Sequence, residues 1–351
     1  MTRTAFASTP AGRRGKWRAH PAQVVLGGFV LAILVGTGLL SLPIAKAGPG
    51  GATLIEALFT AVSAACVTGH VIVDTATFWS PFGQVVILML IQVGGFGVMT
   101  LASVIGLAVM RRLSLRSTLL AATEVKSMGL DDVKGLVLGV VRISLTIEAA
   151  VFVLLFARFA TGFDHTIGEA AWLAGFHAVS SFNNAGFALF SDNLMSFVAD
   201  PFICLPIAAA VILGGLGFPV IMQLRKHARF PLKWTMNTRI VLAVTVALLV
   251  AGTVYITAIE WSNPATLGPL DWPAKLLAGF FQSVQTRTAG FNSVDIGGLD
   301  EATLIGMDAL MFIGGGPAGT AGGIKVTTFA VLFFILLAEI RGDGAVRHAT
   351  C

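Results

Sequence analysis

Long apolar runs alternate with short polar connections along the whole chain. Six runs approach or exceed the roughly 20 residues that a helix needs to cross the hydrocarbon core of a membrane. They cover residues 24–42, 85–110, 136–156, 202–224, 240–259 and, with an interruption, 304–338. This pattern predicts an all-α integral membrane protein that crosses the membrane several times.

The composition and the placement of charge agree with a lipid environment. Of the 351 residues, 56% are hydrophobic and only 12% are charged, and the mean hydropathy is +0.85. Lys and Arg gather at the N-terminus and in the connections 111–134 and 225–239, which predicts that these segments and both termini are cytoplasmic. Because membrane topology and anionic lipid explain the net charge of +5, no nucleic-acid partner is expected. The three cysteines are too scattered to predict a metal site or a disulfide framework.

The three outer connections repeat one pattern, a short apolar helical segment that ends in small residues. The segments are EALFTAVSAACVTGHVIVDT (56–75), AWLAGFHAVSSFNNAGFALF (171–190) and AKLLAGFFQSVQTRTAGFNSVD (274–295). In each, a phenylalanine precedes a glycine by the same interval, and the glycines are Gly69, Gly186 and Gly290. The sequence therefore predicts parallel repeats of membrane helix, re-entrant pore helix and membrane helix.

A glycine turn at membrane depth has a specific chemical meaning. Its backbone carbonyls find no hydrogen-bond donor in lipid, so such a turn persists only where it lines a cavity that holds water or ions. Carbonyl oxygens can replace the hydration shell of a potassium ion, and the C-terminal end of a short helix adds partial negative charge. The repeat therefore indicates a cation pathway.

The motifs AVSAACVTG, SSFNNAGF, VQTRTAGFN and FIGGGPAGTAGGIKVTTFA (312–330) resemble the Trk/Ktr/HKT superfamily of potassium transporters. The resemblance is closest to the membrane (pore) subunit of bacterial Ktr- or Trk-type uptake systems. It implies potassium uptake across the plasma membrane through a selectivity filter of backbone carbonyls. The filter positions that it implies, each a site for K⁺, are Val67, Thr68, Gly69, Asn184, Ala185, Gly186, Thr288, Ala289 and Gly290.

The interrupted last run contains too many glycines to hold a regular helix across the membrane. In the family resembled, this loop lies beneath the filter and acts as a gate. The gate residues are Gly314, Gly315, Gly316, Gly319, Gly322, Gly323 and Lys325. We expect Lys325 to pair with a buried acid, with Glu148 as the candidate partner, because an acid deep in a membrane usually has a partner or a function. The G-x-G-x-x-G match at Gly314 follows no predicted strand and does not indicate a dinucleotide site.

The resemblance also implies partners. It predicts a homodimer in which each protomer has its own pore, bound by cytoplasmic nucleotide-binding regulatory subunits, with membrane lipid around it. K⁺ is the transported ion, Na⁺ is a candidate coupling ion, and no cofactor is expected in this chain. The predicted segments are a cytoplasmic tail 1–22, pore unit 1 at 23–110, a connection 111–134, pore unit 2 at 135–224, a connection 225–239, pore unit 3 at 240–340 and a tail 341–351.

The chain departs from the family pattern at two places. His70 stands where the other two repeats have phenylalanine, so it is either a simple exposed histidine or a pH sensor at the outer mouth. The family has four pore units, and this sequence holds three. A truncated or frameshifted product, a separately encoded fourth unit and another stoichiometry remain open, and the ending RGDGAVRHATC favours truncation, with an inactive product.

Two other classes of function compete with a potassium pore. A secondary transporter of a small solute also uses broken helices, but it predicts inverted repeats, whereas these repeats are parallel. An intramembrane hydrolase would need a nucleophile facing a base, and Cys66 with His70 is the only close pair. The sequence therefore predicts a transporter and not an enzyme.

Overall fold

The computed structural model describes residues 21–117 and 130–342, and within these ranges the chain is helical and forms no strand. The predicted all-α fold is confirmed. The helices are α1 (Pro21–Leu40), α2 (Leu54–Ala65), α3 (Thr75–Phe78), α4 (Pro81–Ser117), α5 (Leu130–Gly162), α6 (Ile167–Phe182), α7 (Pro201–Leu216), α8 (Phe218–His227), α9 (Met236–Glu260), α10 (Trp272–Gln285), α11 (Glu301–Phe312) and α12 (Val326–Arg341). The predicted N-terminal tail, most of the C-terminal tail and the middle of the connection 111–134 lie outside the described residues.

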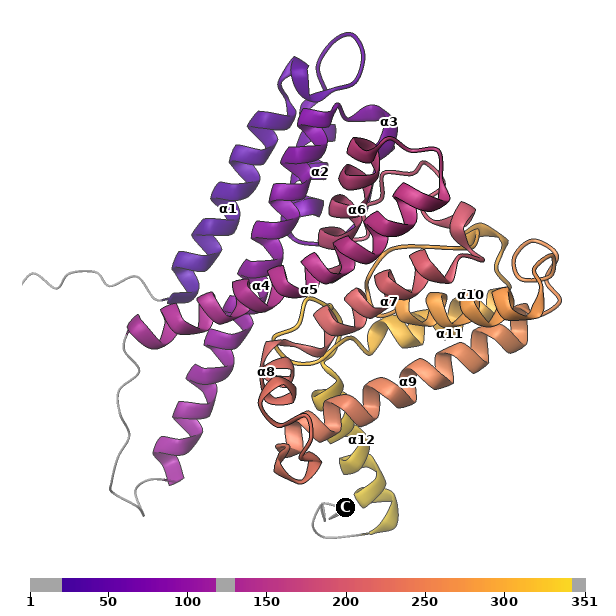
Figure 1. The fold of residues 1–351 in the computed structure, drawn as a ribbon. Coiled ribbons are helices and arrows are strands. Elements are labelled where there is room, and N and C mark those ends of the chain that lie inside the picture. Colours follow the sequence, from indigo (N-terminus) through magenta and orange to yellow (C-terminus); the bar gives the residue numbers. More distant parts are fainter. Residues whose placement is uncertain (1–20, 118–129, 343–351) are drawn as a thin grey trace, which may run out of the picture.

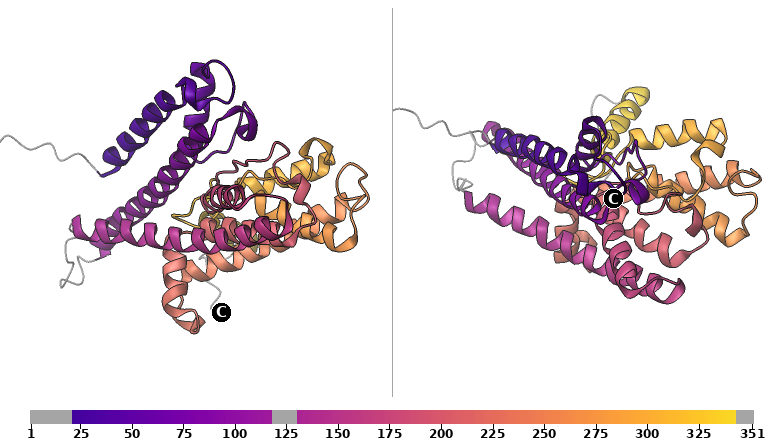
Figure 2. Two further views of the ribbon diagram at one scale, coloured as in Figure 1. Left: turned by 45° about the horizontal axis from the view of Figure 1, so that its top comes forward. Right: turned by 90° about the horizontal axis from the view of Figure 1, so that it is seen from above.

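The helices form three consecutive units of the same kind. Each unit has a long helix, a half-length helix and a second long or broken helix: α1, α2 and α4, then α5, α6 and α7–α8, then α9, α10 and α11–α12. The second unit lies between the other two, because α4 packs against α5 and α6 while α7 packs against α9 and α10 (Figures 1 and 2). This order agrees with the repeat that the sequence predicts.

Three described helical stretches are long and apolar enough to cross a membrane: Pro81–Ser103, Gly135–Gly162 and Met236–Glu260. The described residues contain a fourth span if α7 and α8, which are bent by 102° at their junction, are taken together as one span. The prediction of an unbroken span over 202–224 is therefore wrong. The chain turns at Gly217, where φ is 90°, and a proline at the second position of α8 has no backbone N–H for a continuous helix.

The first two half-length helices begin with the same hydrogen-bonded cap. The Glu56 carboxylate accepts from the Thr53 N–H at 2.7 Å, and the Thr53 hydroxyl accepts from the Glu56 N–H at 3.3 Å. Thr166 and Glu169 make the equivalent pair of bonds at the start of α6. Such a reciprocal cap fixes where a helix starts, so it also fixes where the following turn falls.

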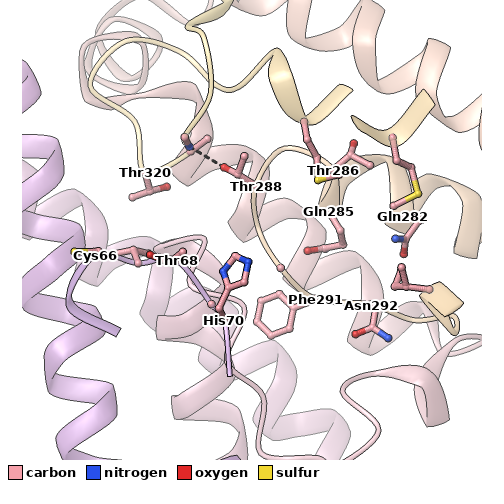
Figure 3. A pocket seen from close by; sticks show the side chains of 18 of the residues that line it. Cys66, Thr68, His70, Gln282, Gln285, Thr286, Thr288, Phe291, Asn292 and Thr320 are labelled. Atoms are coloured by element: carbon pink, nitrogen blue, oxygen red, sulfur yellow. Dashed lines mark hydrogen bonds between the residues drawn. The ribbon is translucent and has the colours of Figure 1, made fainter. Parts of the chain in front are cut away.

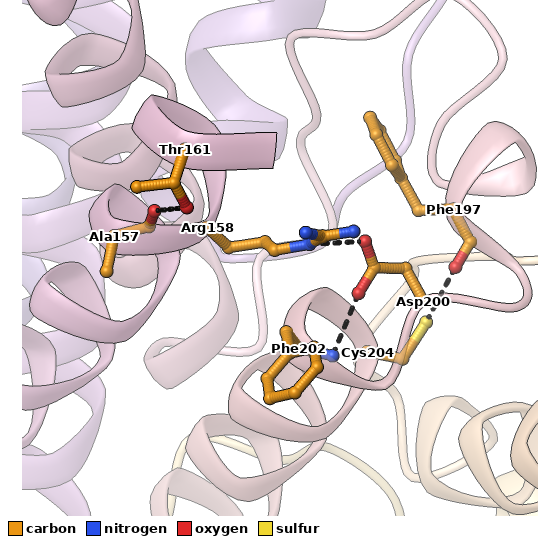
Figure 4. Close-up of polar contacts among 7 residues, drawn as sticks. All are labelled: Ala157, Arg158, Thr161, Phe197, Asp200, Phe202 and Cys204. Atoms are coloured by element: carbon orange, nitrogen blue, oxygen red, sulfur yellow. Dashed lines mark hydrogen bonds and ion pairs between the residues drawn. The ribbon is translucent and has the colours of Figure 1, made fainter. Parts of the chain in front are cut away.

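An ion pair joins the second unit at its predicted outer end. Arg158 near the end of α5 donates through Nε to Oδ2 of Asp200 at 2.8 Å (Figure 4). Asp200 also caps α7, because its Oδ1 accepts from the Phe202 N–H at 2.9 Å. The guanidinium carbon of Arg158 lies 5.3 Å and 5.8 Å from the ring centroids of Phe163 and Phe202. The first long helix of this unit is thus tied to the start of the second.

Candidate functional site

The three half-length helices end in turns of one backbone shape. The first residue of each turn has a left-handed φ: 55° at Val67, 56° at Asn184 and 63° at Thr288. Two residues later, φ is positive again at the glycine that the sequence analysis singled out. A β-branched residue with positive φ is a conformational outlier, so the surrounding structure must impose it.

This backbone shape suits a carbonyl-lined ion site. The residues between the left-handed positions, Thr68, Ala185 and Ala289, are not among those with positive φ. Alternating signs of φ turn successive carbonyls toward the same side of a strand, which is the arrangement that ion filters need. All nine predicted filter residues belong to these turns. That their carbonyls bind K⁺ stays a prediction.

The turns contact one another through their glycines. A Cβ atom on Gly69 would lie 2.3 Å from the carbonyl oxygen of Ala185, and one on Gly186 would lie 2.7 Å from that of Ala289. A Cβ on Gly290 would lie 3.1 Å from the Cα of Gly186. The first turn therefore abuts the second, and the second abuts the third, at positions where only glycine fits.

Two cavities border the turns. On the predicted outer side, a cavity of about 490 Å³ is lined by the three glycines and by Asp74. A second cavity of about 700 Å³ opens beside the first and third turns, where Thr68, His70 and Thr288 line it (Figure 3). Gly69 and Gly290 line both cavities, so the two cavities adjoin at the turns.

Asp74 supplies negative charge to the outer cavity. Partial burial raises the pKa of its carboxyl, but hydrogen bonds from the Ser191 and Thr77 hydroxyls and from the Ala76 N–H outweigh that effect. The net pKa lies below the ordinary value of 3.8. The group is therefore ionised at neutral pH and favours a cation in this cavity.

The predicted gate loop, residues 313–325, is hydrogen-bonded to the second and third turns. The Gly322 N–H donates to the Thr288 hydroxyl at 2.7 Å, a bond drawn in Figure 3. The Thr320 hydroxyl donates to Oδ1 of Asn184 at 3.2 Å. Any rearrangement of the loop that breaks these bonds must therefore act on the turns.

Arg287 makes a third link that the sequence analysis missed. It is a buried cation directly before Thr288, the first residue of the third turn, and its Nη2 donates to the Gly314 carbonyl at 3.2 Å. The signal was available, because a charged residue inside a membrane segment usually has a partner.

The same loop explains the break between α7 and α8. The Gly316 N–H donates to the Gly215 carbonyl at 2.7 Å, and the Thr320 N–H donates to the Gly214 carbonyl at 3.1 Å. In the other direction, the Phe218 N–H donates to the Ala318 carbonyl at 3.2 Å. The loop thus satisfies backbone groups that the broken helix leaves without intrahelical partners.

The predicted pair of Glu148 and Lys325 is wrong. Lys325 begins α12 beside the larger cavity, and its Nζ donates to the Ala321 carbonyl at 2.6 Å. Glu148 instead accepts hydrogen bonds from the side-chain amides of Gln92 on α4 and Asn183 at the end of α6. The two side chains face different neighbours. Nearby polar groups therefore offset the free-energy cost of burying each of them.

Glycine pairs in the second long helices were also missed. A Cβ on Gly94 would lie 2.1 Å from the carbonyl oxygen of Ala65, the last residue of α2. A Cβ on Gly214 would lie 1.9 Å from that of Phe182, the last residue of α6. The repeated GG in VGGFG and LGGLG was the sequence signal for this close backbone approach.

The other candidate chemistry does not assemble. Cys66 and His70 both line the larger cavity, but no hydrogen bond joins them in the part of the chain that the structure describes. Cys204 is buried and donates its thiol to the Phe197 carbonyl at 3.3 Å (Figure 4). Within residues 21–117 and 130–342, no group of three His, Cys, Asp or Glu side chains is arranged to hold a metal ion.

The family model for TrkH, described as a cation transport protein, matches residues 40–350. The chain belongs to the TrkH family. It is 42% identical over 328 residues to Ktr system potassium uptake protein B of Bacillus subtilis, which covers 93% of this chain and 73% of the relative. The protein of the same name from Vibrio alginolyticus is 41% identical over 330 residues, covering 92% of this chain and 70% of the relative.

A solved structure shares the fold of this TrkH-family chain. The crystal structure of the potassium transporter TrkH from Vibrio parahaemolyticus superposes with a TM-score of 0.67 at 18% sequence identity. The match covers 94% of this chain, and this chain spans 64% of the length of that one. The described part of this chain therefore has the same fold as that structure.

Proposed function

We propose that this TrkH-family chain carries potassium ions across the plasma membrane into the cell, through a filter made by the three glycine turns. The observation that carries the proposal is the shared backbone of these turns, left-handed at the first residue and at the glycine, in three segments that touch. Relatives at 42% and 41% identity are named as potassium uptake proteins. The chain acts as a transporter and not as an enzyme.

The loop 313–325 acts as the gate in this proposal. It lies against the turns through the bonds to Thr288 and Asn184, and it borders the larger cavity at Ala321, Gly322 and Lys325. Ions that leave the turns on the inner side would meet this loop. Its many glycines let the backbone change conformation without displacing side chains.

The assembly belongs to the same proposal. The chain forms a homodimer, and cytoplasmic nucleotide-binding regulatory subunits contact its inner face. The basic segment formed by Arg225 and Lys226 in the last turn of α8 and by Arg229 just after it offers a surface for an acidic partner on that side.

Complementation tests the transport function. The chain is expressed in cells that lack potassium uptake, and growth is scored on low potassium with a B. subtilis relative as the positive control. Growth that depends on the chain supports the proposal. No growth, with the chain present in the membrane and the relative active, contradicts transport by this chain alone.

His70 provides a separate prediction about pH. Its side chain is exposed in the larger cavity beside the first turn. We expect His70→Phe, which restores the residue type of the other two repeats, to leave the pH dependence of uptake unchanged. A pH profile that flattens between about pH 5 and 8 in this variant would instead identify His70 as a sensor.

A further inference from the structure

A buried carboxylate stands directly behind the second turn. Glu148 is 4% exposed and lies midway along the span Gly135–Gly162. A carboxylate at that depth is costly unless polar groups surround it, and it usually marks a function or a partner. Glu148 is not part of a turn, so its contacts indicate what it does.

The partners of Glu148 are neutral amides on two other helices. The Gln92 Nε2 group donates to both carboxylate oxygens, at 3.1 Å and 3.2 Å. The Asn183 Nδ2 group donates to Oε1 at 3.2 Å. Among the described residues, none of the hydrogen bonds or ion pairs of Glu148 involves a cation. The Glu148 oxygens accept all three of these hydrogen bonds.

Asn183 connects this cluster to the turn. It caps α6, since its backbone N–H donates to the carbonyls of Val179 and Ser181, and its side chain also donates to the Val179 carbonyl at 2.9 Å. The next residue, Asn184, is the left-handed first residue of the second turn. The amide of Asn183 is thus held on one side by its own helix and on the other by Glu148.

Asn183 also packs against the backbone of α4. A Cβ on Gly95 would lie 1.8 Å from Oδ1 of Asn183, so the amide is pressed against this helix. That oxygen is buried and accepts no hydrogen bond in the described chain. Asn183 therefore depends on its Nδ2 group for polar contact. Glu148 Oε1 is one of three acceptors of that group, with the Val179 carbonyl at 2.9 Å and Gln92 Oε1 at 3.5 Å.

We propose that Glu148 is a positioning residue for the second turn: through Asn183 it sets where the carbonyls of Asn184 and Ala185 lie, and so how well the turns discriminate potassium from sodium. This inference rests on the proposed function. Selectivity in a carbonyl site depends on the placement and the number of the oxygens, so a turn that shifts loses discrimination before it loses binding.

The test measures discrimination without relying on flux. The whole purified chain is heated in detergent while KCl or NaCl is titrated, because an ion that binds the folded state raises the unfolding midpoint. The readout is the ratio of the NaCl to the KCl concentration that gives half of the maximal shift. Glu148→Ala and Asn183→Ala are each expected to lower this ratio about tenfold, which corresponds to about 1.4 kcal/mol. The double variant is expected to match the single ones, since both remove the same contact.

Two further variants separate positioning from other effects. Glu148→Gln keeps an acceptor oxygen for Asn183, so it is expected to keep the ratio within about twofold of the wild type. Glu260→Gln is the matched control, because Glu260 is a fully buried glutamate that binds Thr266 and Thr303 instead of a turn. It is expected to lower the midpoint in both salts and to leave the ratio unchanged.

The outcomes distinguish the two levels of the proposal. If KCl does not change the unfolding midpoint of the wild type, the proposed function is overturned, and so is this inference. A wild type that responds to KCl, with Asn183→Ala at the wild-type ratio, overturns the inference alone. A NaCl to KCl ratio that falls about tenfold in Glu148→Gln also overturns the inference. The charge of Glu148, and not its hydrogen bond, would then set the discrimination between potassium and sodium.

Discussion

Replacing Gly186 with alanine tests whether the turns conduct, because this glycine belongs to the turn that touches both others. Its φ is 69°, in the left-handed region. An added Cβ would lie 2.7 Å from the carbonyl oxygen of Ala289, and the backbone of Gly290 would lie 2.8 Å away. Both neighbours are main-chain atoms of the third turn, so no flexible side chain can yield.

The size of the effect follows from the backbone. Holding alanine in the left-handed region costs about 1–2 kcal/mol. If the second turn relieves that strain by adopting another conformation, the population of the native turn falls by a factor of roughly 5–30. The close contact with the third turn adds to this. We expect potassium uptake by Gly186→Ala to fall by at least the same factor, while the protein still reaches the membrane.

The assay is the initial rate of K⁺ uptake in cells without other potassium uptake, normalised to the amount of chain in the membrane. Gly168→Ala in the first turn of α6 is the matched control, because a Cβ there meets nothing within 4 Å. It is expected to transport like the wild type. Wild-type uptake by Gly186→Ala would refute the view that these turns form the ion path.

Three further predictions concern the loop, the outer ion pair and the outer cavity. Thr288→Val removes the acceptor for the Gly322 N–H, so hydrogen exchange of that amide should quicken by the equivalent of about 0.5–1.5 kcal/mol, and unchanged exchange would contradict the link. Asp200→Ala removes both the helix cap and the pair with Arg158 and should cost about 1–2 kcal/mol in thermal unfolding, whereas Asp200→Asn, which keeps a capping oxygen, should cost less than about 1 kcal/mol. Because the pKa of Asp74 is lowered in the folded state, its stabilising effect is present above its ordinary value of 3.8 and is lost as the pH falls below that value. Asp74→Asn should therefore flatten the acid limb of the stability curve, and an unaltered limb would show that this carboxylate does not contribute.

The repeat could be found from the sequence because it depends on local signals. A short apolar helix followed by a glycine is visible within about 20 residues, and it occurs three times at Gly69, Gly186 and Gly290. The structure adds that the first residue of each turn is left-handed as well. Sequence alone could not give this, because Val67 and Thr288 are β-branched and avoid that conformation.

The features that the sequence analysis missed depend on contacts between distant segments. The break at Gly217 had a local signal in Gly217 and Pro219, but its backbone partners belong to the loop 313–325, about 100 residues further along the chain. Glu148 was identified as unusual, but a search for the opposite charge pointed to Lys325. The actual partners are amides 56 and 35 residues away in the sequence, and amides carry no charge signal.

The differences among the three turns indicate how a gate could act on them. Their backbones agree although their first residues do not, so the shape comes from the packing around the glycines and not from the side chains. The side chains decide instead what each turn is joined to. Asn184 and Thr288 bond to the loop 313–325, whereas the side chain of Val67 has no polar atom with which to do so. A movement of the loop therefore reaches the second and third turns directly through hydrogen bonds, and it reaches the first through the contact of Gly69 with Ala185. On this reasoning Thr288→Val, which keeps the bond from Arg287 to the Gly314 carbonyl, should weaken the coupling between loop and filter while leaving the turn itself in place.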